Sequence, residues 1–154
     1  MKFIADFTLG RLARWLRILG QDTIFYNKLD KDMLIRIGKE KGRIILTKDT
    51  KLIKRRDIGD HLFITSNRIY DQVKEVVNHY RLGCEDTLFT RCIICNTELI
   101  YIERGEIKGM VPDFVFNSKD RFYKCHNCKR IFWEGTHKEK MKRKIEEILS
   151  PLSS

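Results

Sequence analysis

Two CxxC motifs constrain this chain more than any other feature of its sequence. One motif holds Cys92 and Cys95, and the other, after 29 intervening residues, holds Cys125 and Cys128. Each CxxC turn presents two thiolates on one side, so two such turns together form a closed tetrahedral site of four sulfur ligands. That ligand set favours Zn²⁺ in a structural role, because a closed coordination shell leaves no position for a reacting water. Redox-active CxxC pairs and a rubredoxin-like iron site are the alternatives for the same pattern.

One further cysteine and two histidines lie near these motifs but outside their spacing. Cys84 is expected to be a packed or idle thiol. His126 and His137 are alternative ligands, which the four cysteines make unnecessary. Because four of the five cysteines fall in CxxC pairs, metal binding is favoured over disulfides for a cytosolic protein.

Up to about residue 82, the chain alternates between the apolar patterns of a strand and of a helix. The predicted strands cover residues 2–5, 23–26, 43–46 and 61–65. The predicted helices cover residues 9–19, 30–41, 50–55 and 69–80. The first helix has Thr8 as its expected N-cap and Gly20 just after its end. Such alternation predicts a mainly parallel sheet that is covered by helices and joined by right-handed crossovers.

The pattern changes after Gly83, where short strand-like segments surround the two CxxC turns. A strand is predicted over residues 99–102, and the long gap between the motifs is expected to form a hairpin of some length. A terminal helix with one apolar side is predicted over residues 138–149. The expected organisation is an α/β domain over residues 1–88, a zinc ribbon over 89–137, and a C-terminal helix and tail over 138–154.

The chain of 154 residues carries a formal net charge of +10 and has a pI of about 9.5. This balance favours polyanionic partners such as nucleic acid, and it is also compatible with a membrane surface or an acidic protein. No apolar run approaches the roughly 20 residues that a membrane-spanning helix needs, so we expect no membrane insertion. The N-terminal segment lacks the apolar stretch of a signal peptide, so a cytoplasmic location is expected.

Acidic residues follow the predicted strands, at the points where those strands end. Asp6 comes after the first strand and Asp49 after the third. Asp30 and Asp32 open the helix that follows the second strand. The carboxyl ends of parallel strands share one edge of a sheet, where ligands usually bind, so we expect these carboxylates to converge. A convergent group of acids needs a cation, and its oxygen ligands suit Mg²⁺ or Mn²⁺, which activate water for phosphodiester hydrolysis.

Each of these acids also has a simpler interpretation as a helix cap. Asp30 is a natural N-cap, and Asp32 suits a helix N-terminus through the helix dipole. Asp6 and Asp49 each precede a predicted helix and are able to cap it. The residues alone leave both interpretations open.

Basic side chains lie close in sequence to these acids. Arg11 and Arg14 follow Asp6 at helical spacing, and Lys48 precedes the acid after the third strand. All three basic residues are therefore expected within reach of a substrate phosphate. Arg17, further along the same helix, is expected in solvent or in a salt bridge.

A second basic segment surrounds the second CxxC motif. Between residues 119 and 144, ten Lys or Arg residues stand against three acids, with aromatic residues interleaved. Lys124, Lys129 and Arg130 are candidate nucleic-acid contacts, because basic groups engage phosphates and aromatic rings stack on unpaired bases. The alternative is that the aromatic residues, including Phe132 and Trp133, form the small core of the ribbon.

With these residues in view, the chain resembles the RNase domain named for the C-terminal region of the Mut-seven exoribonuclease. The matching segments are FIADFTLGRLARWLRILGQD, GRIILTKDTKL, RCIICNTEL and KCHNCKRIFWEGTHKEKM, in the family's order over about residues 3–141. That family is described as a PIN-like nuclease fold that carries a zinc ribbon. The resemblance therefore implies an α/β fold with a PIN-like, mainly parallel sheet covered by helices, plus a C-terminal zinc ribbon and a terminal helix.

The resemblance also implies a ribonuclease that acts on RNA with Mg²⁺ or Mn²⁺ at its acids. By position, Asp6 matches the acid after the first strand and Asp49 matches the acid of the T-K/R-D motif. Asp30, or alternatively Asp32, fills the middle position at the start of the next helix. The fourth acid of many PIN nucleases has no clear counterpart here. The alternative function is a zinc-ribbon protein that binds RNA or the ribosome without turnover.

Overall fold

The computed structural model describes residues 1–150, except for the side chains of residues 136 and 137. The chain divides into two compact units. The first covers Met1–Asn96, and the second begins at Thr97. The boundaries predicted from the sequence fall after residues 88 and 137. They follow the motifs and the composition of the chain, whereas the boundary between the two units follows compactness. Within the described residues, no helix is long and apolar enough to cross a membrane.

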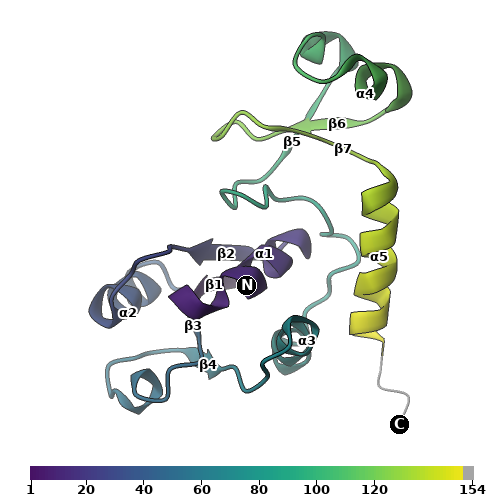
Figure 1. Ribbon diagram of the computed structural model, residues 1–154. Helices are drawn as coiled ribbons and strands as arrows, with labels where there is room; N and C mark the ends of the chain where they lie inside the picture. The colour runs from purple at the N-terminus through teal and green to yellow at the C-terminus, as the bar shows by residue number, and fades with distance from the viewer. Residues whose placement is uncertain (151–154) are drawn as a thin grey trace. The chain divides into compact units, whose positions relative to one another are not determined.

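The first unit is built on a four-stranded parallel sheet in the order β2-β1-β3-β4 (Figure 1). Its strands are β1 (Lys2–Ala5), β2 (Asp22–Phe25), β3 (Ile44–Thr47) and β4 (His61–Phe63). Its helices are α1 (Gly10–Ile18), α2 (Lys31–Glu40) and α3 (Ile69–Tyr80), with the 3₁₀ turns η1 (Phe7–Leu9) and η2 (Leu52–Lys54). All three strand pairings are parallel, which confirms the predicted sheet type.

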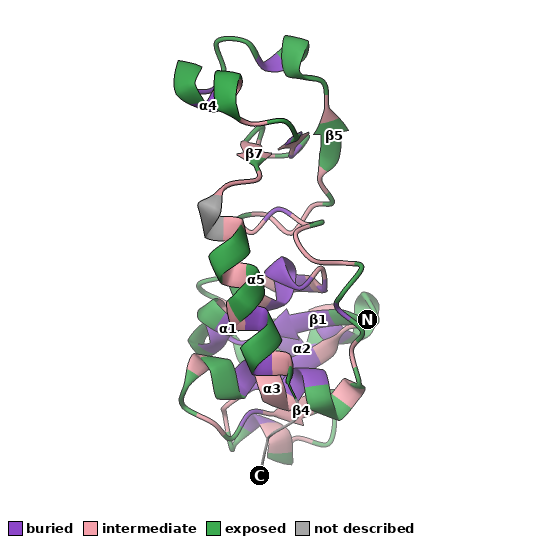
Figure 2. Cartoon of the chain, turned by 90° about the vertical axis from the view of Figure 1, so that its right-hand side faces the viewer, coloured by how far each residue is buried: buried purple, intermediate pink, exposed green. Residues whose placement is uncertain are grey.

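The central strand β1 is apolar on both faces, as a parallel strand between two layers of helices has to be. Phe3 and Ile4 are fully buried (Figure 2). On one face, Ile4 belongs to a core cluster with Ile45 of β3 and Leu34 of α2. On the other face, the ring of Phe3 meets that of Tyr80 in α3. The core therefore lies on both sides of β1 and holds the end of this strand in a fixed position.

The strand order creates a topological switch point between β1 and β3. The chain leaves β1 for β2 on one side and then returns to β3 on the other side. Open parallel sheets bind their ligands in the crevice outside the carboxyl ends of two such strands. The residues that follow β1 and β3, Asp6 and Asp49 among them, lie at this crevice.

The first helix is capped differently from the sequence-based prediction. Asp6 is the N-cap of the turn η1, as its interpretation as a cap allows, and its side chain accepts a hydrogen bond from the Thr8 amide at 2.8 Å; α1 itself has Leu9, not Thr8, at its N-cap position, without a side-chain hydrogen bond. The 3₁₀ turn η1 comes first, so the regular helix starts only at Gly10. At the other end, Gly20 has φ of +83°, a conformation that glycine adopts without strain after a helix.

Other elements differ from the prediction mainly in extent. The basic segment 50–55 forms only the short turn η2, and the fourth strand ends at Phe63 instead of residue 65. The terminal helix starts at Thr136, two residues before the predicted position. Ends of elements carry weak sequence signals, so differences of this size are expected.

The second unit combines a three-stranded antiparallel sheet, in the order β5-β6-β7, with helices. Its strands are β5 (Ile100–Ile102), β6 (Phe122–Lys124) and β7 (Ile131–Trp133). Its helical elements are η3 (Arg104–Ile107), α4 (Asp113–Ser118) and α5 (Thr136–Leu149). Phe122 is buried with Ile107, Val111 and Val115, so one face of this sheet forms a small core with η3 and the α4 segment.

The gap between the CxxC motifs is therefore more than the hairpin that the sequence predicts. β5 and β6 do pair antiparallel, but η3 and α4 lie between them in the chain. Because α4 is only six residues long, it shows too little periodicity to be recognised in the sequence. This insertion supplies the apolar side chains that cover one face of the sheet.

Candidate functional site

Asp6, at the end of β1, is 7% exposed and accepts four hydrogen bonds. Its Oδ1 accepts from the amide and the hydroxyl of Thr8, at 2.8 and 2.6 Å. Its Oδ2 accepts from the Thr47 hydroxyl at 2.6 Å and from the Lys48 amide at 3.0 Å. A carboxylate offers about four lone-pair sites, so these donors occupy all of them and fix the orientation of the group.

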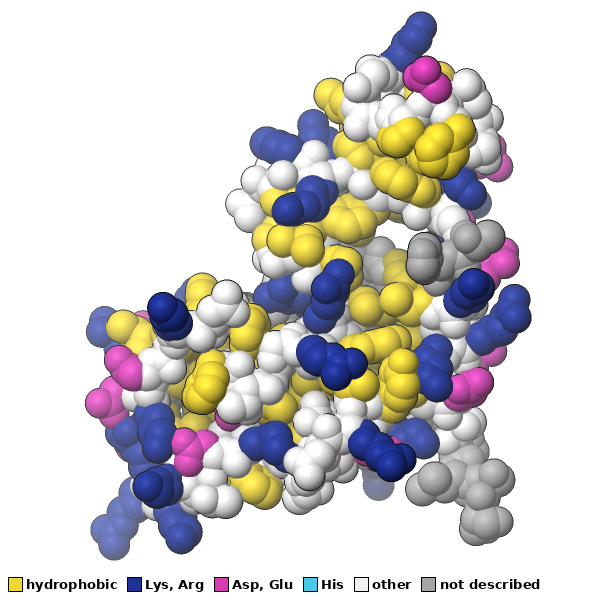
Figure 3. Space-filling model, viewed as in Figure 1, with side chains coloured by type: hydrophobic (Ala, Val, Ile, Leu, Met, Phe, Trp, Pro, Cys, Tyr) yellow, Lys and Arg dark blue, Asp and Glu magenta, His cyan; other side chains and the backbone are white. Residues whose placement is uncertain are grey.

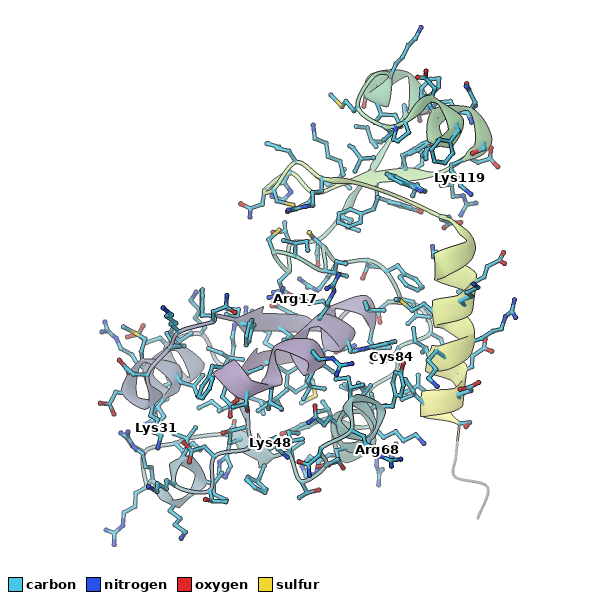
Figure 4. The ribbon with its side chains drawn as sticks, in the orientation of Figure 1. Arg17, Lys31, Lys48, Arg68, Cys84 and Lys119 are labelled. Atoms are coloured by element: carbon cyan, nitrogen blue, oxygen red, sulfur yellow. The ribbon has the colours of Figure 1, made fainter. Side chains whose placement is uncertain are left out.

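Asp49, beyond the end of β3, is held by the backbone and by Lys31. Its Oδ1 accepts from the amides of Lys51 and Leu52, at 2.8 and 3.2 Å, and so caps the turn η2. Its Oδ2 lies 2.9 Å from Nζ of Lys31, the first residue of α2, which is labelled in Figure 4. The hydrogen-bonded Lys31 ammonium holds the pKa of the Asp49 carboxyl below its ordinary value, so this acid is ionised at neutral pH.

Asp30 and Asp32, the two candidates for the middle acid, lie in different surroundings. Asp30 is the N-cap of α2, and its Oδ1 accepts from the Met33 amide at 2.8 Å. It lines the same cleft as the two strand-end acids. The side chain of Asp32 is 83% exposed, pairs with Arg55 at 2.5 Å, and does not line that cleft. Of these two acids, Asp30 is therefore the one that lines the cleft together with Asp6 and Asp49.

An open cleft of about 520 Å³ brings these side chains together. Its lining residues are Asp6, Phe7, Thr8, Leu29, Asp30, Lys31, Leu34, Lys48, Asp49 and Leu52. Three acidic residues and two lysines thus line one space with largely apolar walls. Low-polarity walls strengthen the electrostatic interactions of any charged ligand that enters.

The three basic residues predicted beside the acids occupy different positions. Nζ of Lys48 lies 3.3 Å from the carbonyl of Ile64 and 2.9 Å from that of Ser66, so it ties the end of β3 to the segment after β4. Lys48 lines the cleft, but its ammonium is directed to backbone carbonyls of residues that do not. Arg11 and Arg14 are exposed on α1 and do not line the cleft. Their role as phosphate contacts stays a prediction.

The acids of the cleft are spaced more widely than the cysteines. Within the described part of the chain, the four cysteines are the one group of three or more His, Cys, Asp or Glu residues whose ligand atoms all lie within 4.8 Å of one another. The cleft offers an all-oxygen donor set, which suits Mg²⁺ or Mn²⁺ in type. An ion that binds there has to displace Lys31 from Asp49. It also has to share the Asp6 carboxylate with the hydrogen-bond donors of Thr8, Thr47 and Lys48.

The cysteine cluster is formed by Cys92, Cys95, Cys125 and Cys128, as the motif spacing predicts. In a tetrahedral zinc site with bonds of about 2.3 Å, the sulfur atoms lie about 3.8 Å apart. The four sulfur atoms all lie within 4.8 Å of one another, so the cluster could hold a metal ion. Two of the four cysteines are buried and two are partly exposed.

The other predicted ligand candidates lie outside this cluster. Cys84 is 2% exposed, and burial raises the pKa of its thiol. Its Sγ lies 3.7 Å from the carbonyl of Leu82, so it is a packed thiol. His126 is exposed and does not belong to the cluster. The side chain of His137 lies outside the described residues.

Arg17 was predicted to lie in solvent or in a salt bridge, but it is buried and hydrogen-bonded to the first CxxC turn. Arg17 on α1 is 8% exposed. Its Nη1 donates to the carbonyls of Ile93 and Ile94, between the two cysteines of the motif, at 3.1 and 3.0 Å (Figure 4). Its Nε donates to the carbonyl of Thr23 at 2.9 Å. The prediction was wrong because the carbonyls that recruit this side chain lie 76 and 77 residues away in the sequence.

Asn96, directly after the first CxxC motif, fastens this turn to the edge strand β2. Its side-chain oxygen accepts from the Thr23 amide at 2.9 Å, and its side-chain nitrogen donates to Asp22 at 2.6 Å. Asp22 also pairs with Arg43 at 2.7 Å. Burial alone raises the pKa of Asp22, but the hydrogen bonds from Arg43 and Asn96 hold that pKa below its ordinary value. An edge strand has unpaired backbone groups, which is what allows this attachment.

The basic residues predicted around the second CxxC motif lie around the turn between β6 and β7 and differ in exposure. Lys124 is half-buried on β6, whereas Lys129 and Arg130 are exposed in the turn before β7. On the face of the molecule that Figure 3 shows, lysine and arginine side chains are scattered over the surface. Phe122 lies in the core, but Trp133 is 39% exposed, so the core explains only some of the aromatic residues.

A comparison with protein families matches almost the whole chain. The family model described as Mut7-C RNAse domain matches residues 1–145 of the 154. This match confirms the resemblance that the sequence motifs indicate. The comparisons with curated proteins and with solved structures gave no match.

Proposed function

Because the chain belongs to the Mut7-C RNase domain family, we propose that it is a metal-dependent ribonuclease that hydrolyses phosphodiester bonds of single-stranded RNA in the acidic cleft. One observation carries this proposal: Asp6, Asp30 and Asp49 line a single cleft at the switch point of a parallel sheet. This is where open sheets of this kind bind ligands. Family membership supports a nuclease- or RNA-related role, and the cleft supplies acids suited to it.

The proposed catalytic ion is Mg²⁺ or Mn²⁺, and the residues that would hold it are Asp6, Asp30 and Asp49. When bound, such an ion supplies an activated water and stabilises the leaving oxygen. The chain itself orients the acids: the Thr47 hydroxyl and the backbone fix Asp6, and Lys31 keeps Asp49 ionised. Both acids are thus oriented before an ion arrives, and the ion has to share Asp6 with its hydrogen-bond donors and to displace Lys31 from Asp49.

Lys31 is the group that a divalent ion has to displace. Its side chain is 47% exposed, and an exposed ion pair of this kind is worth about 0–1 kcal/mol. A divalent ion therefore replaces the ammonium at small cost. The released ammonium stays on the wall of the cleft, where it is positioned to contact a substrate phosphate.

The cysteine cluster is proposed to bind Zn²⁺ in a structural role. Four sulfur ligands close the coordination shell, so the ion has no position for water or substrate. The buried Arg17 supports this role, because its guanidinium is a fixed positive charge beside an ion with four thiolates, a centre of net charge −2. Metal analysis of the purified protein distinguishes zinc from iron.

A second function, RNA or ribosome binding without turnover, is favoured by the hydrogen bonds of the acids. Internal donors occupy all the lone-pair sites of Asp6, and Lys31 neutralises Asp49, as expected for acids that serve as caps. In that case the cleft takes up no divalent ion. The basic residues then act alone, and RNA binding depends strongly on salt.

Cleavage of end-labelled single-stranded RNA in the presence of Mn²⁺ tests the proposed activity. We expect Asp6→Asn and Asp49→Asn to lower the rate about 100-fold or more, because each change misplaces the ion relative to the scissile bond. Asp32→Asn is the matched control, since it removes the same charge from an exposed acid outside the cleft. Equal cleavage by the wild type and all three variants indicates a contaminating nuclease and overturns the proposal.

A further inference from the structure

The sheet of the second unit carries a row of aromatic side chains, one from each strand. The register pairs Tyr101 of β5 with Tyr123 of β6, and Tyr123 with Phe132 of β7. Directly paired residues of antiparallel strands project to the same face, so these three rings stand side by side. The rings of Tyr101 and Tyr123 meet edge to face, with 6.1 Å between their centroids. We refer to these three residues as the aromatic row.

The aromatic row lies on the face opposite the core of this unit. Phe122 is fully buried on the other face, where Ile102 and Ile131 pack against its cluster. The members of the row belong to no part of that cluster, and Tyr101 is 54% exposed. The core on the opposite face explains how the sheet is stabilised. It does not explain why three aromatic residues lie on the face of the row.

Charged side chains, two arginines among them, flank the row on the same face. Arg121 and Arg130 are both exposed and stand two residues before the β6 and β7 members of the row. The alternation of side chains along a strand therefore places both guanidinium groups on the face of the row. Continued by one residue, the same register places Glu103 and Glu134 on either side of Arg121, and Glu134 is paired with Lys138 at 2.5 Å. Charges therefore alternate at this end of the row, whereas Arg130 stands at the other end. The segment 119–144 as a whole holds ten basic residues against three acids.

We propose that the aromatic row is a stacking surface for the unpaired bases of single-stranded RNA, with Arg121 and Arg130 engaging its phosphates. Aromatic side chains on a basic surface bind single strands in this way, because every base has a face that stacks. A single strand carries phosphates and bases in alternation, so it can contact arginines and aromatic rings at the same time. A partner without negative charge would not form ion pairs with the arginines. The choice of RNA rests on the proposed function, but binding to the row requires no cleavage in the acidic cleft.

Fluorescence anisotropy with a labelled oligouridine of about 12 nucleotides tests this surface in the full chain. EDTA is omitted so that zinc is retained, and every protein carries Asp6→Asn so that the probe is not cleaved. We expect Tyr101→Leu to weaken binding about fivefold or more, whereas Tyr101→Phe, which keeps the ring, retains wild-type affinity. Phe114→Leu is the matched control, because Phe114 is 71% exposed on α4, outside the row.

Salt dependence separates stacking from charge. Tyr101→Leu should leave the slope of log affinity against log salt unchanged, whereas Arg130→Gln should reduce that slope by about one. Unchanged zinc content and circular dichroism establish that each variant is folded. Wild-type affinity of Tyr101→Leu, an equal loss in Phe114→Leu, or equal binding of duplex RNA overturns the proposal. Selective loss in Tyr101→Leu supports it, even if the wild-type chain cleaves no RNA and the proposed activity fails.

Discussion

The hydroxyl of Thr47 donates a hydrogen bond of 2.6 Å to Oδ2 of Asp6, across the two strands that flank the switch point. The same hydroxyl accepts a hydrogen bond of 3.0 Å from the amide of Asp49. Thr47 is fully buried, so its orientation is set by packing. One side chain therefore fixes the acid after β1 relative to the acid after β3.

Thr47→Val keeps the shape of this side chain and removes the hydroxyl. Because Asp6 loses a buried donor, we expect the free energy of unfolding to fall by about 1–3 kcal/mol, as measured by urea denaturation. Cleavage of RNA with Mn²⁺ should also slow, since the two acids lose their common support. Thr47→Ser retains the hydroxyl and is expected to keep most of both properties. A Val variant with wild-type stability and rate would show that the hydroxyl does not position the acids.

Lys31→Met should increase the affinity of the cleft for Mn²⁺. The change removes the ammonium that competes with the ion for Asp49, a pair worth up to about 1 kcal/mol. We therefore expect the dissociation constant, measured by calorimetry on zinc-loaded protein, to fall about twofold to fivefold. Lys28→Met is the control, because it removes the same charge from an exposed residue of the preceding loop that does not line the cleft. Equal changes in both variants would indicate a general charge effect.

The Lys31–Asp49 pair also makes a prediction about pH. The folded-state pKa of Asp49 lies below the usual 3.8, so its stabilising effect is present above that value and is lost as pH falls through the lower folded pKa. Carboxyl-carbon NMR titration should show this low pKa in the wild type. In Lys31→Met the pKa should move back toward 3.8. A titration curve that is the same in both proteins contradicts the ion pair.

Arg17→Met should loosen the first CxxC turn. The change removes the donor to the carbonyls of Ile93, Ile94 and Thr23, of which only the bond to Thr23 is fully buried, so we expect the free energy of unfolding to fall by about 1–3 kcal/mol. Transfer of zinc to a coloured chelator should become faster. Arg14→Met, which changes an exposed arginine of the same helix, should release zinc at the wild-type rate. Equal release from both variants would show that Arg17 does not support the metal turn.

The features that could be predicted from the sequence are those that repeat along the chain. Apolar spacing located the sheet and its long helices, and the CxxC spacing located the cysteine cluster. The carboxyl ends of parallel strands lie at one edge, so the positions of Asp6 and Asp49 in sequence were sufficient to expect them at one cleft. Their part in catalysis stays a prediction.

The features that escaped prediction depend on contacts between distant residues. Thr47 meets Asp6 from 41 positions away, and Arg17 meets Ile93 from 76 positions away. Neither Arg17 nor Thr47 differs locally from an ordinary residue of a helix or strand. The aromatic row likewise requires the strand register, because Tyr101 is separated from Tyr123 by the inserted helix α4.

A crystal structure of the protein soaked with Mn²⁺, with anomalous scattering recorded at the manganese edge, tests whether the acidic cleft binds the proposed ion. We expect an anomalous peak in the acidic cleft, within bonding distance of carboxylate oxygens of Asp6 and Asp49, with the Lys31 ammonium moved away from Asp49. A cleft without such a peak, in which Lys31 still pairs with Asp49 while zinc fills the cysteine cluster, would contradict the proposed metal site.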